Sequence, residues 1–190
     1  MNEDSPEPRS PSLLARGRDL SDAIIGVLVT RPEASLGEIA QAIGVGRATL
    51  HRRYPSRDAL MAALALGALE QLAAALERAQ PEVGHPLEAL RRTVEELLPI
   101  GHRYQFLYTQ ASLHQHDGLH ARGMALAARL ESLLARAQRE GSLRSSLPRG
   151  WPLDTLGWLL FAAWEGISEG RIAPVDAPEL VISTFLNGLG

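Results

Sequence analysis

The sequence predicts an all-α protein. Apolar residues recur three and four positions apart along almost the whole chain, whereas alternating apolar and polar runs are nearly absent. Prolines and glycines interrupt this pattern at intervals that suit helices joined by short linkers. A hydrophobic share of 45% with 22% charged residues is typical of a chain that buries a core. We therefore expect helices around an apolar core.

Composition excludes several classes of protein. With 0 cysteines there is no disulfide framework, no cysteine-ligated zinc and no thiol nucleophile. The formal net charge of -3 argues against a protein that coats nucleic acid, but it allows a local basic patch. Residues 1–15 begin with MNEDSPEPRSPS, which predicts a disordered acidic tail and no secretory signal. No apolar stretch looks long enough to cross a bilayer, so we expect a cytoplasmic protein without a membrane partner.

The first expected helices are short. An apolar stripe over residues 18–30 ends before Pro32. Ser35 and Glu38 have the spacing of a capping box, which predicts a helix over residues 36–43. Gly44 can adopt the left-handed conformation that ends a helix, and a third helix is expected over residues 47–53.

The remaining pattern predicts longer helices. Their expected ranges are residues 56–80, 87–98, 103–116, 119–139, 153–169 and 177–188. The expected joints are Pro86, Pro99, Gly118, Gly141, Pro148, Pro152, Pro174 and Pro178. We divide the chain into the tail, an N-terminal domain over residues 16–60 and a larger C-terminal domain over residues 61–190.

Residues 36–60 fit two helices joined by a tight turn, the second presented outward. Small and apolar residues occupy the positions that such a hairpin buries: Ile39, Ala40, Ile43, Val45, Leu50 and Tyr54. The remaining positions of the second helix face outward or sideways: Arg47, Ala48, Thr49, His51, Arg52 and Arg53. Arginine can bind guanine through two hydrogen bonds or hold a phosphate. The alternative is a solvated basic surface on an ordinary helical hairpin.

The segment LGEIAQAIGVGRATLHRRYPSRDAL strongly resembles the N-terminal helix-turn-helix of TetR-family transcriptional regulators. The motif Gly141-Ser142-Leu143-Arg144, in the C-terminal part of the chain, also resembles the family, but more weakly. It implies an all-helical homodimer with an N-terminal DNA-binding domain, a C-terminal domain that often binds a small effector, and dimerisation through the last two helices. Gly46 and His51 depart from the family, which usually has serine and tyrosine there.

We assign roles on the second hairpin helix as hypotheses. Arg47, Ala48 and Arg52 are expected at base edges. The residues expected at phosphates are Thr49, His51, Arg53 and Arg57.

The last two helices are apolar on much of their circumference, so they must be covered from more than one side. One side can face the domain's own core and the other a second subunit. The residues predicted for this dimer interface are Leu156, Leu160, Trp164, Phe185 and Leu189. The alternative is that both helices belong entirely to the core.

An effector pocket is expected among the C-terminal helices. Its candidate lining residues are Leu98, Tyr104, Tyr108, Met124, Trp158 and Phe161, any of which can instead be core. His116 and His120 have helical spacing, but Gly118 lies between them and no matching pair follows. We therefore expect neither a metal site nor a cofactor. Motifs for catalysis are absent from the sequence, so an enzyme is not expected.

Together these features predict a dimeric, sequence-specific DNA-binding regulator. We interpret it as a repressor that releases operator DNA when a small apolar or amphipathic molecule binds. The alternative is a helical ligand carrier or adaptor without specific DNA binding.

Overall fold

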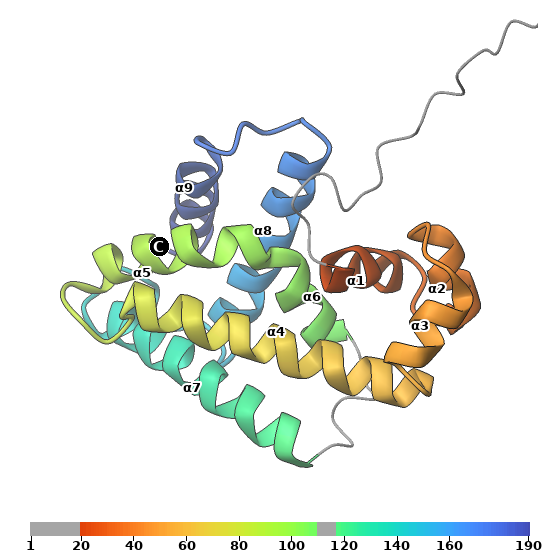
Figure 1. Cartoon of the computed structure of the whole chain (residues 1–190). Helices are drawn as coiled ribbons and strands as arrows, with labels where there is room; N and C mark the ends of the chain where they lie inside the picture. Colours follow the sequence, from red (N-terminus) through yellow and green to blue (C-terminus); the bar gives the residue numbers. More distant parts are fainter. Residues whose placement is uncertain (1–19, 110–116) are drawn as a thin grey trace, which may run out of the picture. The chain divides into compact units, whose positions relative to one another are not determined.

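Helices are the regular elements of the computed structural model of this chain, which describes residues 20–109 and 117–190 (Figure 1). Within those ranges no residue is in a strand, which confirms the all-α prediction. The chain divides into two compact units, Met1–Arg57 and Asp58–Gly190. The predicted tail over residues 1–15 lies outside the described residues.

The first unit contains short helices. They are α1 (Leu20–Thr30), α2 (Leu36–Ala42) and α3 (Arg47–Arg53). Ile24 and Leu28, which belong to the predicted stripe of α1, are fully buried. Helix α2 lies against both α1 and α3. The ends of α2 and α3 agree with the sequence within one residue, because a capping box and a glycine mark them locally.

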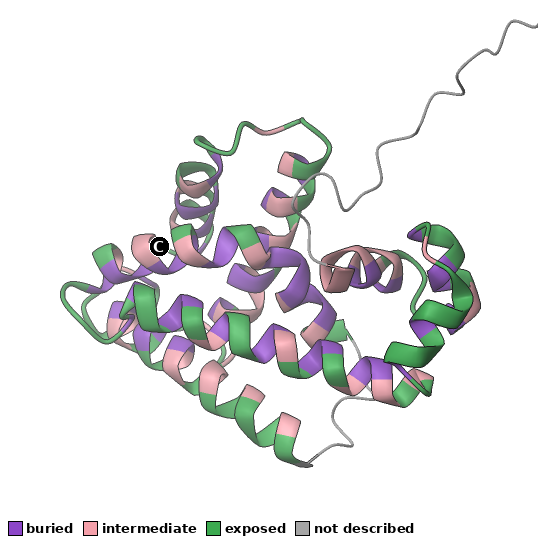
Figure 2. Ribbon diagram, viewed as in Figure 1, coloured by how far each residue is buried: buried purple, intermediate pink, exposed green. Residues whose placement is uncertain are grey.

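The second unit holds the longer helices. They are α4 (Arg57–Ala79), α5 (Pro86–Leu97), the 3-10 turn η2 (Leu98–Ile100), α6 (Gly101–Thr109), α7 (Asp117–Arg139), α8 (Trp151–Ser168) and α9 (Ala177–Leu189). Helix α5 packs on α7 and α9, and α8 packs on α6 and α9. The buried faces of these helices form one core (Figure 2).

Several expected joints lie inside helices instead. Pro86, Pro152 and Pro178 occupy the first turns of α5, α8 and α9. A proline is tolerated there because the first backbone N–H groups of a helix have no partner within the helix. Gly118 lies within α7, whose start at Asp117 precedes the expected one. Helices α5, α7 and α8 therefore begin one or two residues earlier than predicted, whereas α9 begins at the predicted residue.

Helix α4 corrects the expectation that no apolar stretch is long enough to cross a bilayer. By length and composition alone it would pass as a membrane span. Half of its most apolar window is buried inside the protein, as in the core helix of a bundle. Arg129 of α7 also donates to Glu77 of α4 over 2.6 Å. The contacts of α4 thus favour a core helix over a membrane span.

The structure corrects the predicted dimer interface. The side chains on the predicted stripe are already buried within one chain: Leu156, Leu160, Phe185 and Leu189. Trp164 also packs inward, with its ring stacked 4.7 Å from that of His102. Four of the five predicted residues are therefore covered within one chain, and Trp164 is half-buried. The flank of α8 that carries Trp158 is the exposed one.

Candidate nucleic-acid interface and cavity

A capping box fixes the start of α2. The Ser35 side chain accepts a hydrogen bond from the backbone N–H of Glu38 over 3.3 Å. The Glu38 carboxylate accepts in return from the Ser35 backbone N–H over 2.8 Å and from the Ser35 hydroxyl over 2.6 Å. The hydroxyl, followed by the backbone N–H, lowers the pKa of Glu38. The predicted capping box is therefore confirmed.

The turn between α2 and α3 is set by backbone hydrogen bonds around Gly44. That glycine has φ of 72°, a conformation that side chains with a Cβ rarely adopt. Its backbone N–H donates to the carbonyl of Gln41 over 3.3 Å, and the backbone N–H of Val45 donates to the carbonyl of Ala40 over 3.0 Å. This is a Schellman motif, and it ends α2 abruptly.

Helix α3 is held to the hairpin by a single buried residue. Leu50 is 1% exposed, and its neighbours in the hairpin, Ile39 and Ala40, are equally buried. The other α3 residues are all exposed: Arg47, Ala48, Thr49, His51, Arg52 and Arg53. The structure thus presents outward the six α3 residues that the sequence placed there.

The outward face of α3 is strongly basic. Across residues 20–109 and 117–190, Arg47, Arg52 and Arg53 take part in no ion pair. The Arg53 guanidinium lies 5.6 Å from the centre of the Tyr54 ring. Such cations are available to an external anion.

The cap of α3 and the position of Arg47 add detail to this face. Gly46 is the N-cap residue and provides no side-chain hydrogen bond. Arg47 lies close to α2, with its Nε 3.7 Å from the point where a Cβ on Gly37 would sit. The Arg47 guanidinium therefore lies beside α2 in the DNA-free protein.

Arg57 differs from the other residues expected at DNA. Its guanidinium donates to the backbone carbonyl of Pro32, and its Nε is buried. A guanidinium held in this way ties the turn after α1 to the end of the first unit. We therefore assign Arg57 a structural role, which corrects the phosphate contact expected for it.

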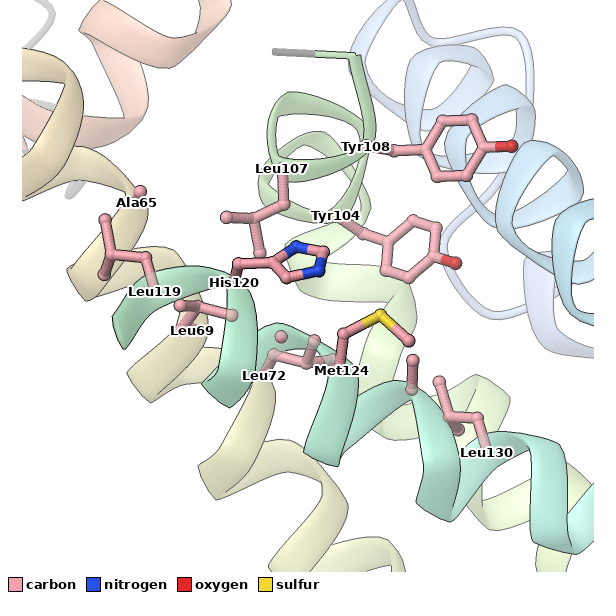
Figure 3. A pocket seen from close by; sticks show the side chains of 12 residues that line it. Ala65, Leu69, Leu72, Tyr104, Leu107, Tyr108, Leu119, His120, Met124 and Leu130 are labelled. Carbon is pink, nitrogen blue, oxygen red and sulfur yellow. The ribbon is translucent and has the colours of Figure 1, made fainter. Parts of the chain in front are cut away.

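The second unit contains a cavity of about 520 Å³ between α4, α6 and α7. Figure 3 shows its lining side chains. Most are apolar, and they are Ala65, Leu69, Leu72, Tyr104, Leu107, Tyr108, Leu119, His120, Gly123, Met124, Ala127 and Leu130. No arginine, aspartate or glutamate is among them. The wall fits an apolar or aromatic molecule.

The structure brings only some of the expected pocket residues to this cavity. Tyr104, Tyr108 and Met124 line it. Leu98 lies instead in the core and is 5% exposed. Trp158 and Phe161 belong to α8 and do not line the cavity. The α4 wall and His120 were missed, because only the packing of three helices brings these distant residues together.

Two tyrosines form the wall towards α8. Burial, followed by the nearby charge of Asp154, raises the pKa of Tyr104 to about 12. The same causes raise the pKa of Tyr108, whose hydroxyl donates to the Asp154 carboxylate over 3.3 Å. Both hydroxyls therefore stay neutral at physiological pH. The cavity wall carries no charge from them.

The two described histidines of the 102–120 segment, His102 and His120, lie in different surroundings. His102 stacks on Trp164, whereas His120 lines the cavity. His114 and His116 lie outside the described residues. The histidine pair considered from the sequence is therefore not described by the structure.

Comparisons with known proteins agree with this geometry. Residues 32–64 match the family described as "Bacterial regulatory proteins, tetR family". The transcriptional repressor LfrR of Mycolicibacterium smegmatis is 37% identical over 187 residues, which cover 95% of this chain and 96% of that protein. The transcriptional regulator NfxB of Pseudomonas aeruginosa is 29% identical, over 93% of this chain and 96% of its own.

Solved structures give the same result. The crystal structure of LfrR from Mycobacterium smegmatis has a TM-score of 0.68 and 32% identity, and covers 90% of this chain and 94% of its own. A second LfrR structure, in complex with proflavine, has a TM-score of 0.64. The basic α3 on its fixed turn, the helical second unit and these similarities agree, and the chain belongs to the TetR family of DNA-binding transcriptional regulators.

Proposed function

We propose that this protein is a transcriptional repressor that a small molecule releases from its operator. Regulators of this family bind operator DNA and act as dimers. The main observation behind this proposal is the exposure of α3. All its side chains except Leu50 are exposed, and its arginines have no ion pair among the described residues. The name of LfrR as a repressor supports the direction of control. Such a regulator acts in the cytoplasm, where its DNA is.

The proposed DNA contacts follow the chemistry of α3. Arg47 and Arg52 can each offer two donors to guanine, and the small Ala48 permits close approach to base edges. Thr49, His51 and Arg53 have the donors that hold phosphates. Because a dimer presents α3 twice, the operator should contain two half-sites about one helical turn, or a multiple, apart.

The proposed effector binds in the cavity between α4, α6 and α7. The cavity of about 520 Å³ is large enough for a drug-sized molecule. Its apolar wall with two neutral tyrosines suits an aromatic or amphipathic compound. The similar LfrR has been crystallised with proflavine, a planar aromatic compound, which supports this class. A ligand releases DNA only if it binds the DNA-free conformation more tightly than the bound one.

A helical ligand carrier would share the cavity but not the DNA contacts. The experiment that separates the two functions is a fluorescence anisotropy titration of DNA from upstream of the protein's own gene, at two salt concentrations. A repressor should lose affinity steeply with salt, by roughly 0.9 logarithmic units per decade of salt for each phosphate contact. A carrier should bind weakly, with little dependence on sequence.

Substitution of Arg52 sharpens this test. If Arg52 reads a base edge, Arg52→Ala should weaken operator binding by about 1–3 kcal/mol and relax base preference at one position. Arg149→Ala is the matched control, because the Arg149 side chain is 93% exposed and belongs to the second unit. Equal weakening by Arg52→Ala on operator and unrelated DNA would refute the base-reading role.

A further inference from the structure

Helices α6 and α8 meet where each offers a glycine to an aromatic residue of the other. A Cβ added to Gly157 of α8 would overlap the Tyr104 ring. A Cβ added to Gly101 of α6 would lie 2.9 Å from the Cβ of Trp164, closer than real Cβ atoms come. We call this contact the α6–α8 seam, formed by Gly101, Tyr104, Tyr108, Gly157, Trp158 and Trp164.

Aromatic rings continue from the cavity to the exposed flank of α8. The Tyr104 and Tyr108 rings are 6.4 Å apart, and the Tyr108 and Trp158 rings are 5.9 Å apart. Trp158 in turn lies 6.4 Å from Phe161. Trp158 is 48% exposed. One end of this row of rings therefore lines the cavity, and the other lies at the surface.

The seam leaves Tyr104 little room. Figure 3 shows both hydroxyls pointing towards α8, and the Tyr104 ring lying nearer than the Tyr108 ring to Met124 and His120. The Tyr104 ring lies directly against the backbone of Gly157, and the hollow beside this contact has no room for a water molecule. Close-packed contacts of this kind pass on a displacement, because they contain no void to absorb it. A molecule that presses on Tyr104 must therefore move the ring against α8.

We propose that occupancy of the cavity is transmitted through the α6–α8 seam to the exposed flank of α8, where it changes the contact with the second subunit. The exposed flank offers two large apolar side chains to that second copy, Trp151 and Trp158, and α9 has a further exposed apolar side chain, Leu180. The inference rests on the proposed function, because it requires a dimer and a cavity that accepts an effector. Coupling is reciprocal, so dimerisation changes the affinity of the cavity by the same factor.

The test fills the cavity without needing the natural effector. Met124→Phe adds a ring to the cavity wall at a side chain that is 56% exposed, so the fold tolerates it. The readouts are the dimer dissociation constant, from sedimentation equilibrium, and tryptophan emission. All 3 tryptophans lie in α8, so emission reports on that helix alone. We expect the dimer constant to change by roughly 5-fold or more.

A double-mutant cycle then isolates the seam. In a Tyr104→Leu background, which removes the ring from the seam, Met124→Phe should change the dimer constant by less than about 2-fold. In a Gly123→Ala background the full effect should persist. Gly123 lines the cavity away from the seam, and a Cβ there meets only Leu69, at 3.7 Å. If Tyr104→Leu does not fold, judged by its helical circular dichroism, Tyr104→Met, which also removes the ring, replaces it.

Two results would overturn the inference. One is an equal effect of Met124→Phe with and without Tyr104, and the other is no effect of Met124→Phe in the otherwise unchanged protein. Failure of the proposed function is measured separately, by operator titration of the unchanged protein with and without proflavine. A protein that binds its operator specifically but lacks seam coupling keeps the first proposal and loses the second.

Discussion

Leu50→Ala is the substitution that most sharply tests how α3 is held. Leu50 is the one buried residue of a helix of 7 residues, and it is 1% exposed. The change removes three carbon groups at about 0.8 kcal/mol each, or about 2.4 kcal/mol, and leaves a void whose cost raises the total to about 3–4 kcal/mol. So short a helix does not persist alone in water. We therefore expect α3 to lose its position.

Two assays check this prediction. Urea unfolding followed by circular dichroism measures the free energy of unfolding, and anisotropy with operator DNA measures the loss of binding. Leu66→Ala makes the same chemical change at a side chain that is 38% exposed, and it should cost less than about 1 kcal/mol. If Leu50→Ala kept the operator affinity of the unchanged protein, or cost no more than Leu66→Ala, the anchoring role of Leu50 would be wrong.

Further predictions concern caps and pH. Gly46→Ser should stabilise α3 by a few tenths of a kcal/mol in thermal unfolding, because the serine hydroxyl can accept a hydrogen bond from a backbone N–H of the first turn. Gly46→Ala has no such acceptor and should not stabilise α3. Because the folded protein lowers the pKa of Glu38 from 4.5, its stabilisation is present above that pH and lost as the pH falls. Thermal midpoints from neutral to acidic pH should show this dependence, and Glu38→Gln should reduce it, leaving the part due to Glu82, whose pKa Arg129 also lowers. Arg92 donates to the carbonyls of Ala79, Gln80 and Val83 at the end of α4, so Arg92→Ala should cost about 1–3 kcal/mol in urea unfolding, more than Arg91→Ala at an exposed ion pair.

The features predicted correctly from the sequence depend on neighbours along the chain. Ser35 and Glu38 are three residues apart, and Gly44 ends α2 through its own backbone conformation. The exposed face of α3 follows in the same way, because a single apolar position, Leu50, decides which side turns inward. Signals of this kind are complete within a few residues, so they can be recognised without the fold.

The features predicted wrongly depend on contacts between distant residues. The Arg57 guanidinium donates a hydrogen bond to the carbonyl of Pro32, which lies 25 positions away in the sequence. On α8, two apolar flanks compete for the core, and the pattern does not say which one α6 and α9 cover. The cavity likewise needs α4 beside α6 and α7. Pro152 was predicted as a joint between helices but lies in the first turn of α8, because a proline is found at the start of a helix as readily as after its end.

The most direct test of the central claim is hydroxyl-radical footprinting on the DNA upstream of the protein's own gene. The claim is that a dimer places two copies of α3 in the major groove of one operator. It predicts two protected half-sites related by a two-fold axis, about one helical turn or a multiple apart, and a higher concentration of Arg52→Ala protein to protect both. A single unsymmetrical footprint, or no footprint at a concentration that saturates binding, would contradict the claim.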